Sequence, residues 1–502
     1  MSPMKLNPLT RSILLVILIT GIAYLLFYPI LNNTFLSDDY FSLYRISIEK
    51  RILFKEFLRP MIDITFYLNY AISGMNPGSY YLFNVIVHIA NTYLLYKLAK
   101  KYILFEGSSQ EQFALLSSFL FLIYPFHNEG IVWLSGRLSS LACLFALISL
   151  NSSVSFQKNN LKIILPSFFY IMGLLCYESI ILLPIIIIIL TWDKAKPRKN
   201  IIWSMIVWFL ITSLYLFVRY TLSEEIYGDY GHRMIEGSMV VMLLKFLKTT
   251  GRLFLPPFED SNKLVIIFSI VILFLLLIHL KLFQKNLFKN VLINKYFRLI
   301  ISLLVALTIP FAFGISTRTS EGDRLLYFPS CFLCMMIAYL FVYFLKTTAW
   351  KMIFLSIITV YFIYFLERNN NQWIKASETT CLILDTLKTS PADHIVLINL
   401  PDELEGAFVF RNGFRQSLIL NKIDTAKVIV NHPLKRLEYL KIKDTIRASQ
   451  EKDGLFIFPA TRIEKFADTI RIFDDSSRNT ATISQKNSAV YYWNKTNLIK
   501  LF

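Results

Sequence analysis

Long apolar runs, separated by short polar stretches, fill the chain up to about residue 368. Runs such as 12–28, 180–190 and 264–278 are long or dense enough to cross, or nearly cross, a lipid bilayer. The pattern therefore predicts a polytopic α-helical membrane protein with about eleven transmembrane helices. We expect these spans at roughly 12–31, 79–97, 112–126, 131–150, 161–176, 177–192, 201–218, 263–283, 297–315, 325–345 and 350–366.

Beyond residue 368 the pattern changes to short apolar runs between polar or Pro-, Gly- and Asp-containing stretches. Such runs are typical of β-strands, and residues 373–387 have the pattern of an amphipathic helix. The expected strands lie at 394–399, 406–410, 427–430, 454–458 and 489–493. We expect a transmembrane module over 1–368, whose first external loop covers about 32–78, and a small α/β domain over 369–502 outside the membrane.

Composition and charge agree with this class of protein. A chain of 502 residues that is 55% hydrophobic is too apolar for an ordinary soluble protein. Lys and Arg occur in short clusters at alternate ends of the expected spans, as one cytoplasmic face requires, and they explain the net charge of +18 without a nucleic-acid partner. This orientation places the N-terminus in the cytoplasm and the 369–502 domain on the extracytoplasmic face. The Lys-, Ile- and Asn-rich composition favours a bacterial inner membrane, with a periplasmic domain.

Residues 41–58 of the first external loop mix apolar side chains with Arg45, Lys50, Arg51 and Lys55. This mixture is typical of a basic helix that lies in the membrane interface. Such a helix could hold an anionic lipid headgroup beside the acids that precede it. It could equally be a structural helix whose long basic side chains reach back to the headgroups.

Asp38 and Asp39 lie side by side a few residues after the first expected span. A carboxylate pair at the mouth of a membrane protein is costly to place there, and carboxylates perform acid–base or metal-assisted chemistry. We therefore take Asp38 and Asp39 as the candidate catalytic residues. Glu178 is another lone acid between two apolar runs on the same face, and the pattern leaves open whether it is functional or structural.

A polar stripe marks the second expected span, where Asn84, His88 and Asn91 occur at i, i+4 and i+7 and so share one helix face. Polar groups inside a membrane need partners within the protein. The stripe predicts hydrogen bonds to neighbouring helices or direct contact with a substrate, and the spacing leaves both open.

His127 and Glu129 follow a proline at a helix entrance on the external face. A histidine and an acid two positions apart can position a phosphate and its counter-ion. They can also join a carboxylate such as Asp38 as ligands of a divalent cation, which would be the protein's one candidate cofactor.

Several arginines occur on the same external face. Arg137 lies inside an apolar run, where an unpaired charge would cost at least ~2.5 kcal/mol, so a partner is implied, either Glu129 or a ligand phosphate. Arg219 follows the expected span at 201–218, and Arg324 precedes the one at 325–345. The arginine fork donates two parallel hydrogen bonds to phosphate, so acids and arginines together indicate an enzyme that uses a lipid-phosphate-linked substrate.

These motifs, in their order along the chain, resemble the GT-C superfamily of membrane glycosyltransferases, and in particular its protein O-mannosyltransferase-like and TMTC-like branches. The likeness covers about residues 12–366. Its elements are Leu36-Ser37-Asp38-Asp39-Tyr40, Arg59-Pro60, the stretch from Tyr81 to Asn91 that contains His88, the stretch from Tyr124 to Arg137, Tyr177-Glu178, and Asp323-Arg324 followed by Tyr327 to Ser330.

The resemblance implies a polytopic inverting transferase that uses a polyprenyl- or dolichyl-phosphate sugar, with the first-loop acid near the acceptor. We expect Asp38 or Asp39 to accept a proton from the acceptor hydroxyl, which belongs to a protein, a lipid or a glycan. The phosphate and substrate ligands expected from the motifs are Arg59, His88, His127, Glu129, Arg137, Glu178, Arg219, Arg324 and Tyr327. The rival interpretations are a transporter or flippase for a lipid-linked glycan and a ligase that works on such glycans.

Overall fold

The computed structural model describes residues 7–54, 57–155, 161–192, 198–223, 239–257, 263–272 and 295–431, and most of 448–501. The chain divides into two compact units. Residues 1–31 and 52–370 form the first, which we call the helical unit, and residues 32–51 and 371–502 form the second, the carboxy-terminal unit.

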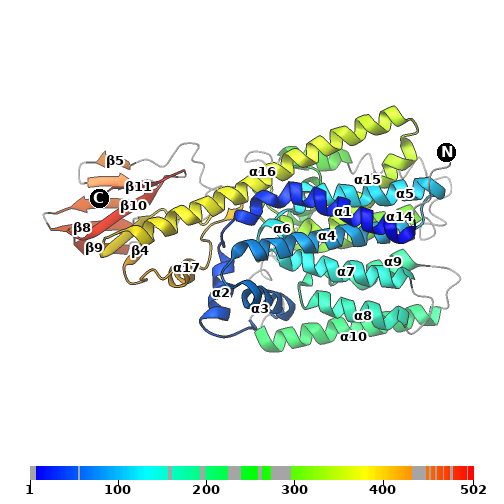
Figure 1. Ribbon diagram of the computed structural model, residues 1–502, viewed down its shortest axis with the longest axis horizontal. Coiled ribbons are helices and arrows are strands. Elements are labelled where there is room, and N and C mark those ends of the chain that lie inside the picture. Colours follow the sequence, from blue (N-terminus) through cyan, green and yellow to red (C-terminus); the bar gives the residue numbers. More distant parts are fainter. Residues whose placement is uncertain are drawn as a thin grey trace. The chain divides into compact units, whose positions relative to one another are not determined.

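The helical unit is built from helices that run alongside one another (Figure 1). Its main helices are α1 (Pro8–Phe27), α3 (Pro60–Ser73), α4 (Pro77–Lys101), α5 (Gly107–Ile123), α6 (Glu129–Val132), α7 (Arg137–Ser155), α8 (Leu161–Leu174), α9 (Leu183–Thr191), α10 (Arg198–Ser223), α12 (Met239–Arg252), α14 (Lys295–Phe313), α15 (Tyr327–Phe344) and the first part of α16 (Thr348–Thr389). Short 3₁₀ turns connect several of them: η1 (Tyr28–Asn32), η2 (Pro125–His127), η3 (Glu178–Ile180) and η6 (Asp323–Leu326). The core lies where α4, α5, α7 and α15 pack together.

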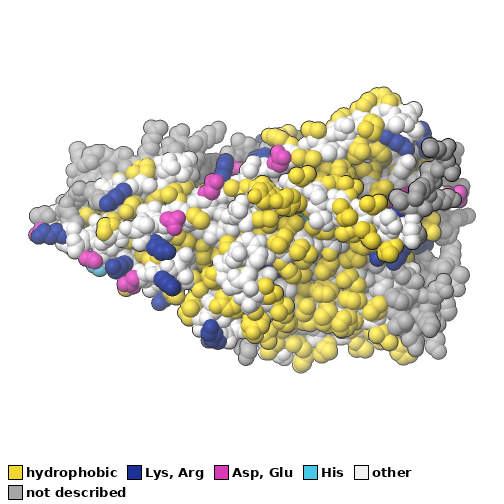
Figure 2. All heavy atoms as spheres, in the orientation of Figure 1, with side chains coloured by type: hydrophobic (Ala, Val, Ile, Leu, Met, Phe, Trp, Pro, Cys, Tyr) yellow, Lys and Arg dark blue, Asp and Glu magenta, His cyan; other side chains and the backbone are white. Residues whose placement is uncertain are grey.

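Seven helical segments among the described residues are long and apolar enough to cross a bilayer, which indicates an integral membrane protein. They are Leu9–Asn32, Pro77–Lys101, Arg137–Val154, Ile202–Leu222, Lys295–Phe313, Asp323–Phe344 and Thr348–Thr389. Hydrophobic side chains cover much of the visible face of this unit (Figure 2). Each of the expected spans contains a helix, although only residues 263–272 of the span at 263–283 are described. The total of about eleven stays a prediction.

The expected span at 350–366 and the expected amphipathic helix at 373–387 are parts of one helix, α16. The stretch between them contains neither Pro nor Gly, so nothing in it stops the helix. The side chains of Asn369 and Asn370 donate hydrogen bonds within the helical unit, to the carbonyls of Pro125 and Leu26, at 2.9 Å each.

The described residues of the carboxy-terminal unit include two larger sheets and the short helices α2 (Asp38–Ser47) and α17 (Phe414–Leu420). One sheet has the order β11-β10-β1-β4, in which β1 pairs in parallel with β10 and β4. The other is an antiparallel meander in the order β5-β6-β7-β8-β9, and β2 and β3 form a separate hairpin. The strand bounds are β1 His394–Ile398, β2 Glu403–Leu404, β3 Ala407–Phe408, β4 Val428–Asn431, β5 Ala448–Glu451, β6 Gly454–Ile457, β7 Thr461–Lys465, β8 Thr469–Asp474, β9 Asn479–Ser484, β10 Ser488–Trp493 and β11 Leu498–Lys500.

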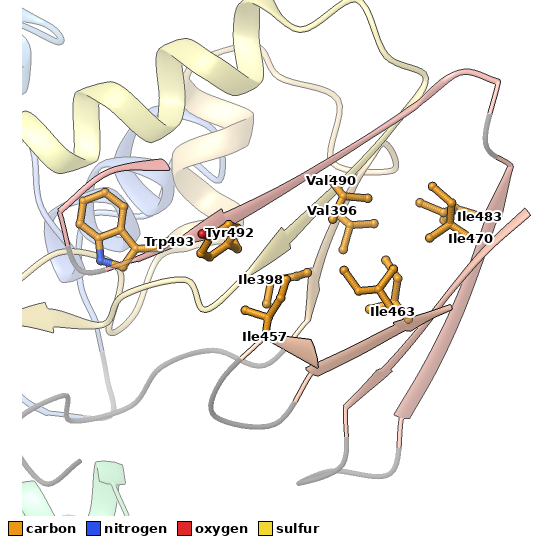
Figure 3. Packing of buried hydrophobic residues seen from close by; sticks show 10 residues of the cluster. Val396, Ile398, Ile457, Ile463, Ile470, Ile483, Val490, Tyr492 and Trp493 are labelled. Carbon is orange, nitrogen blue, oxygen red and sulfur yellow. The ribbon is translucent and has the colours of Figure 1, made fainter. Parts of the chain in front are cut away.

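Alternating apolar side chains from both sheets form one core, which includes Val396, Ile398, Ile463, Ile470 and Val490 (Figure 3). The expected small mixed α/β architecture is therefore confirmed, with a strand in each of the five predicted runs. The first part of the unit is α2, which contains the two neighbouring acids.

The basic helix predicted over 41–58 is wrong in extent, because α2 begins at Asp38 and ends at Ser47. The backbone N–H of Arg51 donates to the carbonyl of Arg45 at 3.0 Å, and Lys50 has a φ of 58°. This turn stops the helix, and residues 55–56 lie outside the described part of the chain.

Candidate functional site

Asp38 and Asp39 open α2, but their side chains have different surroundings. Asp39 is fully buried, and its Oδ2 accepts a hydrogen bond from the backbone N–H of Leu36 at 3.0 Å. Asp38 is half-buried, and its Oδ1 accepts from Nδ2 of Asn412 at 2.7 Å. Of the two acids, Asp38 is therefore the more exposed, whereas Asp39 is held within its own turn.

The polar stripe of α4 lies inside the helical unit, with Asn84, His88 and Asn91 all fully buried. Asn84 donates to the carbonyls of Ile131 and Trp133 at 3.0 and 3.3 Å. The hydrogen bonds that the stripe makes to neighbouring elements match one of its two expected roles, hydrogen bonding within the protein.

Tyr327 links this stripe to α15. His88 Nε2 lies 3.2 Å from the carbonyl of Leu122, and because a carbonyl only accepts, Nε2 carries the ring proton. Nδ1 of His88 therefore accepts from the hydroxyl of Tyr327 at 2.6 Å, while Asn91 donates to the same hydroxyl oxygen at 3.2 Å. The order of donors and acceptors is thus fixed by the carbonyl of Leu122.

His127, in η2, is fully buried and stacks on the ring of Tyr327 at a centroid distance of 4.5 Å. Its Nδ1 lies 3.0 Å from Oγ of Ser330, which itself donates to the carbonyl of Tyr327 at 2.7 Å. Nδ1 must therefore carry the proton, and Nε2 has no hydrogen-bond partner among the described residues. Burial lowers the pKa of His127 well below the ordinary value, and the neighbouring His88 adds to this effect, so the ring is neutral.

Glu129 and Asp323 each pair with an arginine, and we call these four residues the Asp323 cluster. Glu129 accepts from the side chain of Arg324 and, at 3.0 Å, from its backbone N–H, while Asp323 pairs with Arg252. The side chains of Glu129, Asp323 and Arg252 are at most 1% exposed, and that of Arg324 is 15% exposed. Because both oxygens of Glu129 are engaged by Arg324, this arrangement disfavours Glu129 as a metal ligand.

Arg137 is fully buried at the start of α7, and the expectation that it pairs with Glu129 is wrong, since Glu129 pairs with Arg324. Its guanidinium donates to Oδ1 of Asn69 at 2.7 Å and lies 4.3 Å from the centre of the Phe66 ring. The residue before it is Gly136, which packs closely against the backbone of Glu129. A Cβ at this position would lie 2.3 Å from the carbonyl oxygen of Glu129.

Arg59, Glu178 and Arg219 come together from three parts of the helical unit, and we call them the Glu178 cluster. Arg59 NH2 lies 2.9 Å from one carboxylate oxygen of Glu178, and Arg219 NH1 lies 3.1 Å from the other. Their side chains are 19%, 15% and 3% exposed for Arg59, Glu178 and Arg219. The Arg59 guanidinium also lies 4.9 Å from the centre of the Tyr177 ring, and its Nε has no hydrogen-bond partner among the described residues.

Within the described parts of the chain, no three His, Cys, Asp or Glu side chains gather as a metal site. The candidate set of Asp38, His127 and Glu129 draws on both units and stays a prediction. Two residues that make these contacts, Arg252 and Asn412, had not been predicted from the sequence. Arg252 follows the lysines of an amphipathic stretch and so resembles an interfacial charge, while Asn412 stands in a polar loop with no signal of its own.

Comparison with known proteins gives distant, partial homology to protein O-mannosyl-transferases. The chain is 37% identical to TMTC2 of Mus musculus over 92 residues, which are 18% of this chain and 10% of that protein. It is 32% identical to TMTC3 of Homo sapiens over 89 residues, or 18% and 9% of the two chains, and 29% identical to Tmtc1 of Drosophila melanogaster over 128 residues, or 24% and 14%. The match spans about a tenth of these relatives' length, and no family model matches. The resemblance predicted from the motifs is confirmed to this extent.

Among solved structures, the fold is similar to the archaeal oligosaccharyltransferase AglB from Archaeoglobus fulgidus, determined with an inhibitory peptide and a dolichol-phosphate. The TM-score is 0.43 at 12% identity, and the likeness covers 77% of this chain and 62% of that one.

Proposed function

We propose that the protein is a membrane glycosyltransferase of the GT-C type. It transfers a sugar, with inversion, from a polyprenyl-phosphate donor to an acceptor hydroxyl on the extracytoplasmic face. The observation that carries this proposal is the segment homology to several protein O-mannosyl-transferases. About eleven spans in a bacterial inner membrane, a cytoplasmic N-terminus and a periplasmic domain over 369–502 complete the proposal.

Asp38 is the proposed general base. It is the half-buried member of the acid pair, so an acceptor hydroxyl can approach its carboxylate, whereas Asp39 is fully buried against its own turn. The deprotonated oxygen attacks the anomeric carbon from the side opposite the phosphate, and the bond from that carbon to the phosphate oxygen breaks. A positioned base of this kind typically contributes about 10²–10⁴ to the rate.

The Glu178 cluster is the proposed site of the leaving phosphate. Arg59 is partly exposed, and Arg59 and Arg219 set two guanidinium groups against the single carboxylate of Glu178, so positive charge remains for a ligand. Guanidinium groups held beside the leaving oxygen stabilise its charge, which lets the phosphate leave without protonation. The other expected ligands act in this proposal by shaping the protein around the site, as the buried contacts of His88, His127 and Tyr327 do.

The test uses the purified protein in detergent and a panel of radiolabelled polyprenyl-phosphate sugars. Wild type should release polyprenyl phosphate, and Asp38→Asn should lose at least about 10²-fold in turnover. Asp393→Asn is the matched control, because Asp393 is an exposed acid of the same unit that also accepts from an asparagine, at 2.8 Å.

Four outcomes differ in meaning. Release that depends on Asp38 but not on Asp393 supports the transferase and names its donor. Wild-type turnover in Asp38→Asn rejects the base assignment. Saturable binding of the lipid without release, in the presence of acceptor extracts, rejects the transferase in favour of a transporter or flippase. Transfer of a whole glycan between lipids would favour a ligase.

A further inference from the structure

Asn412 stands in the loop before α17, far from Asp38 in sequence, yet its side chain contacts the proposed base directly. Its Nδ2 donates to Oδ1 of Asp38 at 2.7 Å. Both residues belong to the carboxy-terminal unit. The distance is that of a strong hydrogen bond to an ionised acceptor.

The backbone around this contact is also fixed from the same loop. The N–H of Asn412 donates to Oγ of Ser37 at 3.2 Å, and the N–H of Ser37 donates to the carbonyl of Val409 at 3.0 Å. Ser37 is fully buried and has φ 47° and ψ −117°, a conformation that a residue with a side chain rarely adopts. Such a conformation persists only where neighbouring groups determine it, and here those groups come from the loop at 409–412.

Gly413 shows how closely the loop approaches the acid turn. It has φ +74°, and a Cβ at this position would lie 2.5 Å from the carbonyl oxygen of Ser37. Glycine is therefore required both by the left-handed backbone and by the contact. The loop packs directly against the residue that precedes Asp38.

The loop is itself held by an ion pair. Arg411 pairs with the fully buried Glu403 of β2 and lies 3.8 Å from Asp402. Its guanidinium lies 4.3 Å from the centre of the Phe408 ring in β3. The β2–β3 hairpin thus anchors the residue beside Asn412, and through it the side chain that contacts Asp38.

We propose that Asn412 is a positioning residue of the transferase, which holds the carboxylate of Asp38 in one orientation for proton abstraction. This inference rests on the proposed function. It gives the carboxy-terminal unit a part in the chemistry, in addition to any part in recognising the acceptor. A donated hydrogen bond favours the ionised form of a carboxylate, so loss of Asn412 should change both the orientation and the protonation of Asp38.

The first test compares Asn412→Ala with Asn487→Ala. Asn487 is a matched control, because it donates to Asp393 in the same unit at 2.8 Å and both contacts are exposed. Asn412→Ala keeps its backbone hydrogen bond to Ser37. We expect kcat to fall about tenfold with little change in KM, and the acid limb of the pH–rate profile to move to higher pH. Asn487→Ala should match wild type in all three.

The second test reads Asp38 without using turnover. Carbodiimide labels protonated carboxyl groups, so mass spectrometry of the Asp38 peptide across pH follows its protonation. Labelling in Asn412→Ala should extend to higher pH than in wild type. If that variant does not fold, Asn412→Asp keeps the side-chain shape and, by like-charge repulsion, should move labelling in the same direction.

The outcomes separate the two proposals. Turnover that requires Asp38 but is unaltered in Asn412→Ala, with unaltered labelling, overturns this inference and leaves the transferase intact. Absence of release from every donor in wild type overturns both. A tenfold loss with both pH shifts, absent from Asn487→Ala, supports the positioning role, because a merely structural contact would leave the acid limb of the turnover profile where it is in wild type.

Discussion

The helical unit contains two groups of arginines and acids that differ in composition and exposure. In the Asp323 cluster each carboxylate has its own guanidinium, and three of the four side chains are at most 1% exposed. In the Glu178 cluster two guanidinium groups contact one carboxylate, and Arg59 and Glu178 are 19% and 15% exposed. In the first group every charge has a partner of opposite charge, whereas the second has more cationic groups than acids and two partly exposed side chains.

This difference separates two uses of the same residue types. Matched buried ion pairs are costly to desolvate and add little net stability, but they fix the elements that carry them, here α6, α12 and η6. A cluster with surplus arginine is poised for an anion, because the ligand supplies the missing negative charge and the guanidinium fork matches a phosphate. Only the second arrangement is expected to respond to an added lipid phosphate.

The largest effect should come from Arg252→Met in the Asp323 cluster. The substitution leaves the carboxylate of Asp323 buried without its partner, and a broken buried pair costs about 3–5 kcal/mol. We expect a marked fall in the unfolding temperature in detergent, followed by the loss of monodisperse protein on size-exclusion chromatography.

The control is the double variant Arg252→Met/Asp323→Leu, which removes the stranded charge. It should recover the part of the loss that is due to the unpaired carboxylate, although the carbonyls of Ser316 and Leu255 still lose a donor. A single variant as stable as wild type would show that the pair does not fix this region.

The next effect should be on binding, through Arg59→Met in the Glu178 cluster. Loss of a charge-assisted hydrogen bond to phosphate should weaken the affinity for polyprenyl phosphate about 10- to 100-fold. Stability should change less than in Arg252→Met, because Glu178 keeps its contact with Arg219 at 3.1 Å. Titration of intrinsic fluorescence with the lipid, at low and high salt, measures both the affinity and its electrostatic part.

Lys351→Met is the control for Arg59→Met, since it removes an exposed cation of the same unit that contacts Gln112 at 3.3 Å. Its affinity for the lipid should equal that of wild type. Equal loss in both variants would mean that binding follows overall charge, and an unchanged affinity in Arg59→Met would place the phosphate elsewhere.

A smaller effect is expected from Arg137→Lys, which keeps the charge but not the planar fork. The lysine cannot both donate to Asn69 and stack on Phe66 as the guanidinium does, so the unfolding free energy should fall by about 1–2 kcal/mol. Binding of polyprenyl phosphate should not change. Normal stability with weakened lipid binding would instead indicate that Arg137 binds the substrate, as its motif first predicted.

Local patterns predicted much of this fold, since each expected span contains a helix and each of the five predicted runs contains a strand. The end of α2 was missed because its stop is a turn between Arg45 and Arg51, not a change in polarity. The break expected before residue 373 is absent because Asn369 and Asn370 find acceptors on other elements. The first error comes from a local turn that polarity does not report, and the second from tertiary contacts that override a local signal.

The candidate site was predictable by residue type but not by pairing. Glu129 and His127 were both singled out, yet the partner of Glu129 lies 195 positions away, at a separation that no spacing rule reports. Asp38 and Asp39 were equivalent in sequence, and only their surroundings separate an accessible acid from a buried one. The contact between Asn412 and Asp38 could be found only from the structure, because a lone asparagine in a loop can have many roles.

The smallest effect concerns His127, which comes two residues before Glu129 of the Asp323 cluster and lies outside the seven candidate spans. Its pKa in the folded protein is lowered by burial and by His88, so the unfolded chain takes up a proton near pH 6.5 while the folded protein does not. Stability from the neutral ring is therefore complete above that pH and declines as the pH falls below it. Between pH 7.5 and 5.5 we expect wild type to lose about 1 kcal/mol more than His127→Gln.

The measurement is a set of unfolding curves in detergent for both proteins across this pH range. The free energy of unfolding of each protein is compared with its own value at pH 7.5, which removes the constant cost of losing the stack on Tyr327. Curves that diverge on acidification identify a dry environment beside the Asp323 cluster. Curves that stay parallel would mean that water or a proton reaches His127 in the folded protein, so this region would be as open to ligands as the Glu178 cluster.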